Sequence, residues 1–140
     1  MYKHILIPID GSERSYAGLA QGLGLASALG ASVTVLTVYS AYRPTSMETV
    51  HLEGGHTEYE REAKERARSS LSQAAAQATA AGVSCTTEMR ESNNPAQTII
   101  DIAMTQGCDL IAMASRGHGG LAAVLLGSQT QKVMAHSTLP

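Results

Sequence analysis

The stretch His4–Ser12, HILIPIDGS, decides the fold. Its first six residues are almost wholly apolar and predict a strand buried on both faces, and Asp10-Gly11-Ser12 predicts the turn that ends it. Ser12 can cap a helix that runs to Gly30, and residues 32–39, SVTVLTVY, are rich in β-branched side chains and predict a second strand. A strand, a helix and a second strand in this order imply a parallel sheet.

The rest of the chain continues this alternation. The expected elements are a long charged helix over 57–81 begun by a Thr57/Glu60 capping box, an edge strand over 83–90, a helix over 94–106 begun by Asn94-Pro95, a fourth strand over 109–114, and a last helix begun by a capping box at Ser128. We therefore predict one domain over residues 1–140, an open, doubly wound, mainly parallel α/β sheet with helices on both faces.

One segment has no clear period. Residues 41–56 contain Pro44 and Gly54-Gly55, and they predict a mobile loop that is long for a compact domain. His51, Glu53 and His56 have side chains that can bind metals, but two glycines and a loop are a poor frame for coordination. We expect no metal site.

Composition excludes several classes of function. Ten Lys and Arg residues against twelve Asp and Glu residues give a formal charge of −2, so no basic field favours nucleic acid or an anionic membrane surface. No apolar stretch has membrane-spanning length and the start does not resemble a signal peptide, so we expect a cytoplasmic protein. Cys85 and Cys108 are far apart in apolar surroundings, which predicts reduced, inert thiols.

The chemistry is concentrated after Gly107. Four further glycines occur there, no Asp or Glu follows Asp109, and Arg116 and Lys132 are unopposed. Glycine lets backbone N–H groups approach a ligand closely, and a helix that starts at Ser128 adds its positive end. These features predict a site for a phosphate chain.

The predicted sheet gives this site a place. Ligands of open α/β sheets bind at the carboxyl ends of the strands, where the strand order reverses. If the first and fourth strands are neighbours, Asp10 lies near Arg116 and Gly117 and can accept hydrogen bonds from ribose hydroxyls. No GxxxxGK[ST] sequence is present, and the G-x-G-x-x-A match at 117–122 lacks the acidic residue and the following strand of a dinucleotide-binding unit.

Residues 114–128 resemble the Gly-x2-Gly-x9-Gly-[Ser/Thr] pattern of ATP-binding universal stress proteins. Ala114-Ser115-Arg116-Gly117 is followed by nine residues and then Gly127-Ser128. ILIPIDGS, TVLTVY and LLGSQTQKV extend the resemblance over the whole chain. The resemblance implies an adenine-nucleotide alpha-hydrolase-like, Rossmann-like sandwich and a homodimer. It also implies ATP as the ligand, with Mg²⁺ on the phosphate oxygens as an option and AMP or ADP as alternatives.

The resemblance also implies roles for individual residues. Asp10 would contact the ribose, the backbone near Val38 the adenine, and the amides around Gly117 and Gly127 the phosphates. Pro8 and Met113 would flank the base or the ribose. The full set assigned to the nucleotide is Pro8, Ile9, Asp10, Val38, Met113, Ala114, Ser115, Arg116, Gly117, Gly127, Ser128, Gln129 and Thr130.

The chain departs from the family pattern in two places. Ala114 stands where the motif has its first glycine, and its methyl is tolerated only if it does not occupy the space of the phosphates. Family members also continue after a Leu-Pro with an apolar strand that often pairs across a homodimer, whereas this sequence stops at Pro140. We expect four strands, with a fifth strand missing from the sequence or the edge covered by a partner.

Three functions are compatible with these patterns. The first is a regulatory ATP-binding protein in which the nucleotide biases conformation or dimerisation. The second is a slow ATPase, which the absence of a P-loop lysine and of an evident base disfavours. The third is a dimeric interaction module that binds no nucleotide.

Overall fold

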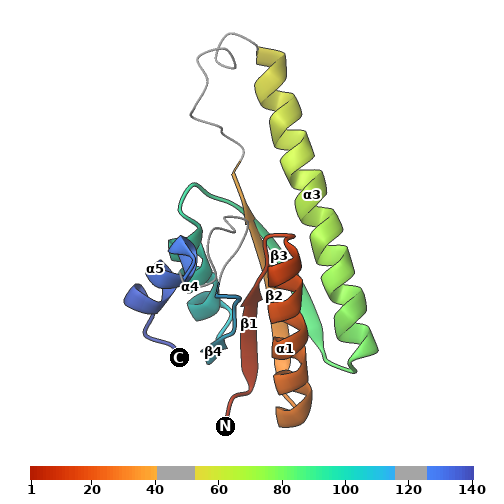
Figure 1. Ribbon diagram of the computed structural model, residues 1–140, viewed down its shortest axis with the longest axis vertical. Helices are drawn as coiled ribbons and strands as arrows, with labels where there is room; N and C mark the ends of the chain where they lie inside the picture. The colour runs from red at the N-terminus through yellow and green to blue at the C-terminus, as the bar shows by residue number, and fades with distance from the viewer. Residues whose placement is uncertain (41–52, 116–125) are drawn as a thin grey trace.

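The computed structural model describes residues 1–40, 53–115 and 126–140, with residues 53–57 described by their backbone alone. Strands and helices alternate along these ranges, as predicted (Figure 1). The elements are β1 His4–Pro8, α1 Glu13–Leu29, β2 Ser32–Tyr39, α3 Glu53–Ala80, β3 Cys85–Glu91, α4 Pro95–Thr105, β4 Leu110–Ile111 and α5 Ser128–His136.

The strands form one parallel sheet in the order β3-β2-β1-β4. From β1 the chain adds β2 and then β3 on one side, and it returns to place β4 on the other side of β1. The strand order therefore reverses between β1 and β4, which confirms the predicted neighbours and the doubly wound sheet. β3 lies at an edge, as its lower apolar content predicts.

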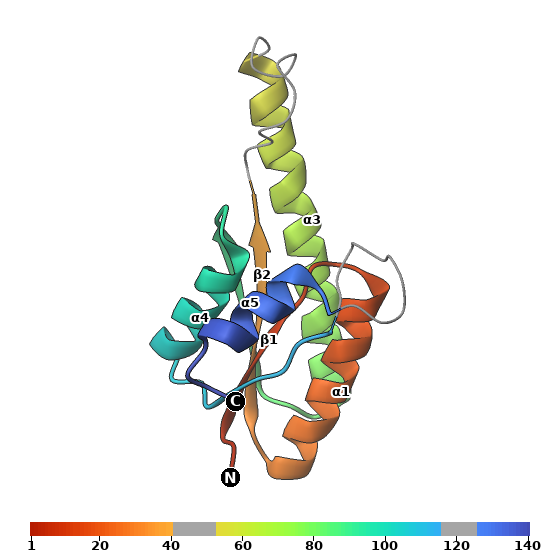
Figure 2. The same ribbon diagram turned by 60° about the vertical axis from the view of Figure 1, so that its left-hand side comes forward.

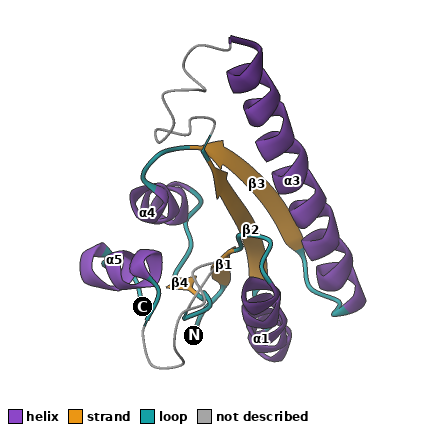
Figure 3. Cartoon of the chain, turned by 45° about the horizontal axis from the view of Figure 1, so that its top comes forward, coloured by secondary structure: helices purple, strands orange, loops and turns teal. Residues whose placement is uncertain are grey.

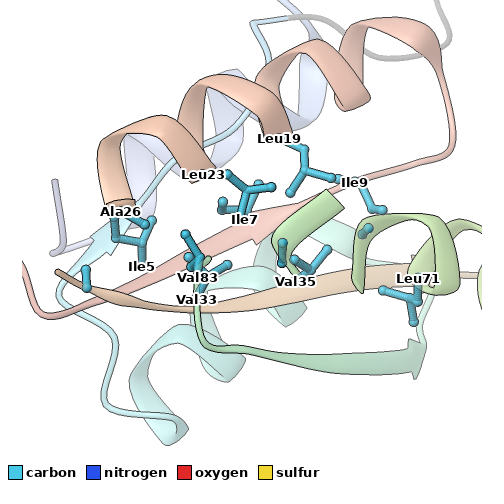
Figure 4. Packing of buried hydrophobic residues seen from close by; sticks show 13 residues of the cluster. Ile5, Ile7, Ile9, Leu19, Leu23, Ala26, Val33, Val35, Leu71 and Val83 are labelled. Atoms are coloured by element: carbon cyan, nitrogen blue, oxygen red, sulfur yellow. The ribbon is translucent and has the colours of Figure 1, made fainter. Parts of the chain in front are cut away.

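Helices cover both faces of the sheet. α1 and α3 pack on one face and α4 and α5 on the other (Figure 3). Side chains of a strand point alternately to the two faces, so Ile5 and Ile7 of β1 meet α1 while Leu6 joins the cluster under α4. Figure 4 shows the first cluster, in which β1 and β2 contribute a layer of Ile and Val beneath α1.

Helix α1 starts and ends where the sequence predicts. Ser12 is its N-cap, and its Oγ accepts a hydrogen bond from the Ser15 N–H at 3.2 Å. Gly30 ends the helix in the left-handed conformation, with a φ of 66°. The helix lies close to the sheet because Gly22 has no side chain, since a Cβ there would lie 2.6 Å from Ile7 Cδ1.

Helix α3 starts earlier than predicted. It begins at Glu53, so the predicted mobile loop is wrong for residues 53–56 and the predicted capping box at Thr57 does not start the helix. Each residue added to an existing helix gains a hydrogen bond, which offsets the poor helix propensity of Gly54 and Gly55. The remainder of the predicted loop, residues 41–52, lies outside the described residues.

Helix α3 runs past the end of the sheet, as Figure 1 shows. Its exposed side carries the predicted pairs Glu60–Lys64 and Glu62–Arg66, with N–O distances of 4.0 and 3.9 Å. Its buried side is a stripe of Ala63, Ala67 and Leu71 that continues to Ala78. Within the described ranges no helix is long and apolar enough to cross a membrane.

Strand β4 is shorter than the predicted 109–114, because the regular pairing covers only Leu110 and Ile111. Single hydrogen bonds extend the contact with β1, from Asp109 N–H to the His4 carbonyl and from Ala112 N–H to the Leu6 carbonyl. On its other side, the Ile111 N–H donates to the Pro140 carbonyl at 3.0 Å. The described residues form four strands, and the end of the chain covers one donor on the outer edge of β4.

Candidate functional site

The carboxyl ends of β1 and β4 lie at the point where the strand order reverses. Asp10 and helix α1 follow β1, and residues 112–115 follow β4. The Gly127 N–H donates to the Ser115 carbonyl at 2.6 Å, so the start of α5 lies beside the end of the β4 segment. The chain segments that follow β1 and β4 and the start of α5 thus lie at one edge of the sheet (Figure 2).

Asp10 is exposed and held in a defined position. Its Oδ1 accepts hydrogen bonds from the Ser12 N–H at 2.9 Å and from the Ser12 Oγ–H at 2.6 Å. Gly11 turns the chain between them with a φ of 84°, and a Cβ there would lie 3.0 Å from Ser70 Oγ of α3. These contacts fix the orientation of the Asp10 carboxylate at the end of β1.

Helix α5 presents its N-terminus to this edge. Gly127 is its N-cap, with no side-chain hydrogen bond, and no acidic residue occurs in its first turn. The predicted cap at Ser128 is therefore wrong by one residue, because Ser128 is already helical. The first N–H groups of a helix lack partners within the helix, so those that begin at Ser128 are suited to an anion.

The side chains of Gln129 and Thr130 serve the fold. Gln129 Oε1 accepts a hydrogen bond from the Ala96 N–H in the first turn of α4, at 3.1 Å. The buried Thr130 Oγ1 donates to the Ala114 carbonyl at 2.9 Å. Both side chains are engaged within the fold, so only the backbone groups of Gln129 and Thr130 are left for the predicted contact with phosphates. The sequence contains no local pattern that indicates Ala96 and Ala114 as their partners.

The apolar residues assigned to the base and ribose lie at the ends of β1, β2 and β4. Pro8 of β1 is paired with Leu36 of β2. The next residue, Ile9, donates its N–H to the Leu36 carbonyl at 2.8 Å. Val38 and Met113 are partly buried against the cluster under α4 and α5, and Ile9 is buried on the α1 side.

Ala114 is placed against helix α1. A Cβ built on Gly18 would lie 3.2 Å from Ala114 N, 3.3 Å from Ala114 Cβ and 3.4 Å from Ala114 Cα. The methyl that replaces the first glycine of the motif therefore lies toward Gly18. Arg116 and Gly117, the other residues assigned to the start of the phosphate segment, lie outside the described residues.

The described residues give little support to covalent or metal chemistry. Burial raises the pKa of the Cys85 thiol, and burial with the nearby Asp109 charge raises the pKa of Cys108 to about 11, so neither is a ready nucleophile. Both cysteines are free thiols. Among the side chains that the structure describes, no group of three or more His, Cys, Asp or Glu could hold a metal, and His51, Glu53 and His56 are not among them.

The fold and this edge define a doubly wound α/β protein with the N-terminus of a helix at its topological switch point. The model of the universal stress protein family matches residues 1–140. The chain is 31% identical over its whole length to the "Universal stress protein in QAH/OAS sulfhydrylase 3'region" of Thermus aquaticus and covers 96% of that protein. The chain belongs to the universal stress protein family.

Solved structures agree with this assignment. The universal stress protein UspA from Lactobacillus plantarum has a TM-score of 0.83 at 25% identity, with 99% of this chain and 94% of that chain covered. Hypothetical protein MJ0577 has a TM-score of 0.80 at 27% identity, with 100% and 93% covered. A universal stress protein in complex with cAMP shares the fold, with a TM-score of 0.69 at 22% identity and 99% and 92% covered.

Proposed function

We propose that this universal stress protein is a regulatory protein that binds ATP at the carboxyl edge of β1 and β4. The α5 N-terminus is the observation that carries the proposal. It begins at Gly127 without a side-chain cap or an acidic first turn, and the Gly127–Ser115 hydrogen bond places it beside the β4 segment. The positive end of a helix at this edge suits the phosphates of a nucleotide.

The other assigned residues contact the ribose, the base and the phosphates. Asp10 accepts hydrogen bonds from the ribose, and Pro8, Ile9, Val38 and Met113 supply apolar contact for the base. Backbone groups of Ser128, Gln129 and Thr130 serve the phosphates. Any Mg²⁺ would be held mainly by phosphate oxygens, because the described residues offer no cluster of carboxylates there. AMP and ADP fit the same base and ribose contacts.

The proposal favours binding over turnover. The sequence lacks the GxxxxGK[ST] lysine that polarises phosphates in P-loop proteins, and no base is evident among the described residues of this edge. The complex with cAMP belongs to a distant relative, and for this chain the proposal depends on its own residues. We further propose that the protein acts as a homodimer in the cytoplasm, without nucleic acid as a partner.

Mass analysis of the nucleotide released from denatured, freshly purified protein tests this function. We expect ATP, unhydrolysed over hours of incubation, and a change in conformation or dimerisation when it is removed. Steady production of ADP would replace the proposal with a slow ATPase. A site that stays empty even after ATP is added would favour an interaction module without nucleotide.

A further inference from the structure

Ala114 lies between helices from opposite faces of the sheet. On one side its N, Cα and Cβ lie 3.2 to 3.4 Å from the place that a side chain at Gly18 of α1 would occupy. On the other side its carbonyl accepts the hydrogen bond from Thr130 of α5 at 2.9 Å. The next residue, Ser115, accepts the hydrogen bond from Gly127. The start of the proposed phosphate segment is therefore fixed between α1 and α5.

The alternation of side chains after β4 explains where the Ala114 methyl points. Leu110 and Ala112 pack on the cluster beneath α1, so Ala114, two residues further, belongs to the same side. Gly22, one helical turn after Gly18, stands opposite Ala112, since a Cβ on Gly22 would lie 3.7 Å from Ala112 Cβ. Figure 2 shows the chain after β4 running toward α1.

We infer that Gly18 is a positioning residue for the described base of the proposed phosphate site, which consists of Ala114, Ser115 and Gly127. Its missing side chain leaves the space that the Ala114 methyl takes, so the segment can begin with alanine and still keep its phosphate side clear. This inference rests on the proposed function for its consequence in binding. The contact itself does not depend on a nucleotide.

A side chain at residue 18 would disturb this arrangement. The new Cβ would meet backbone atoms of Ala114, which have to move by a few tenths of an ångström to restore ordinary contact distances. That movement is directed at α5, where the hydrogen bonds of Ala114 to Thr130 and of Ser115 to Gly127 close the base of the segment. Small displacements of positioned groups weaken binding steeply.

The chain offers a matched control on the same helix. Gly24 has no atom within 4 Å of the place of its Cβ, so Gly24→Ala adds the same methyl and the same gain in helix propensity without a contact. The set of proteins is the unchanged chain, Gly18→Ala, Gly24→Ala, Ala114→Gly and the double variant Gly18→Ala/Ala114→Gly. The double variant moves one methyl from residue 114 to residue 18.

Two readouts separate the positioning role from the proposed function. Hydrogen exchange of the Gly127 amide reports on the base of the segment without any nucleotide, and calorimetric titration with ATP reports on binding. In Gly18→Ala we expect faster exchange at Gly127 and ATP affinity weaker by roughly tenfold. Gly24→Ala should match the unchanged protein in both. The double variant should recover part of the loss, because it removes the contact with the Ala114 Cβ and keeps those with the Ala114 N and Cα.

Unchanged exchange at Gly127 in Gly18→Ala would overturn the inference, whatever the ATP result. If the unchanged protein binds no ATP while exchange follows the expected pattern, the proposed function fails and the positioning contact stands.

Discussion

At the scale of single residues, β2 contains two buried threonines, and their hydroxyl groups differ in hydrogen bonding. Thr34 is fully buried, and its Oγ1 is hydrogen bonded to His4 Nε2 at 2.7 Å and to Thr86 Oγ1 at 3.1 Å. Thr37 is 6% exposed, and its Oγ1 is the buried side-chain polar atom without a hydrogen-bond partner in the described part of the chain. A buried hydroxyl is favourable only when it is paired.

These environments predict opposite effects of one substitution. Thr37→Val should raise the free energy of unfolding by about 1 kcal/mol, because it removes an unpaired hydroxyl from the core. Thr34→Val, the control on the same strand, should lower it by about 1–2 kcal/mol because it breaks two hydrogen bonds. Urea unfolding followed by circular dichroism measures both, and a loss of stability in Thr37→Val would show that its hydroxyl has a partner or a ligand.

The two cysteines give a second prediction at this scale. Cys108 is buried with a pKa of about 11, and burial raises the pKa of the partly exposed Cys85 as well. Only about one part in a thousand of Cys108 is thiolate at pH 8. Labelling of the native protein with a polar thiol reagent should be slow at both residues, with Cys85 first, and fast at both in urea. Rapid labelling of Cys108 in the native protein would contradict its burial.

At the scale of the elements, the fit of α1 on the sheet depends on which of its glycines face neighbours. Gly22 faces the fully buried Ile7, whereas Gly24 faces open space. Gly22→Ala should therefore lower the free energy of unfolding by about 1–3 kcal/mol through overpacking. Gly24→Ala should raise it by about 0.5–1 kcal/mol through helix propensity. Thermal unfolding of both variants checks this, and equal shifts would rule out close packing as the reason for Gly22.

Strands β1 and β4 are joined at their amino ends by Asp109. Its carboxylate accepts hydrogen bonds from the backbone N–H groups of Lys3 at 2.8 Å and His4 at 3.0 Å. These bonds hold the pKa of Asp109 below its ordinary value of 3.8. Because the folded-state pKa is lowered, the ionised Asp109 stabilises the fold at pH values above 3.8. This contribution is lost as the pH falls through the folded-state pKa.

Asp109→Asn should therefore reduce stability at pH 7, and the difference from the unchanged protein should shrink on acidification below pH 4. Asp101→Asn is the control, since Asp101 is exposed and is bonded to Gln97 of its own helix. Urea unfolding at a series of pH values makes the comparison. A difference that stays constant from pH 7 to pH 3 would show that the charge of Asp109 plays no part.

At the scale of the whole molecule, local patterns predicted the fold well. The apolar run of β1, the β-branched residues of β2 and the caps Ser12 and Asn94 each act within a few residues of their effect, and all are confirmed. Helix α3 starts at Glu53 and not at the predicted Thr57, because extension of an existing helix offsets the poor propensity of Gly54 and Gly55. Helix α5 has Gly127 as its N-cap in place of the predicted Ser128.

The candidate site was predictable in its composition and less so in its contacts. Asp10 and the segment around Ala114 meet at one edge because the strand order reverses there, which the alternation of elements implied. The partners of Gln129, Thr130 and Gly18 are 16 to 96 residues away in the chain, and only the packed structure reveals them. The homodimer and the nucleotide stay predictions.

Calorimetric titration of ATP into the unchanged protein and Gly127→Val tests the central claim most directly. Gly127 has φ −60° and ψ 148°, a conformation open to valine, so the substitution adds a side chain at the proposed phosphate position without backbone strain. We predict that the unchanged protein and the exposed control Gly24→Val bind ATP, and that Gly127→Val loses binding while keeping its circular dichroism spectrum. Equal ATP affinity in all three proteins would contradict the assignment of the α5 N-terminus to the phosphates.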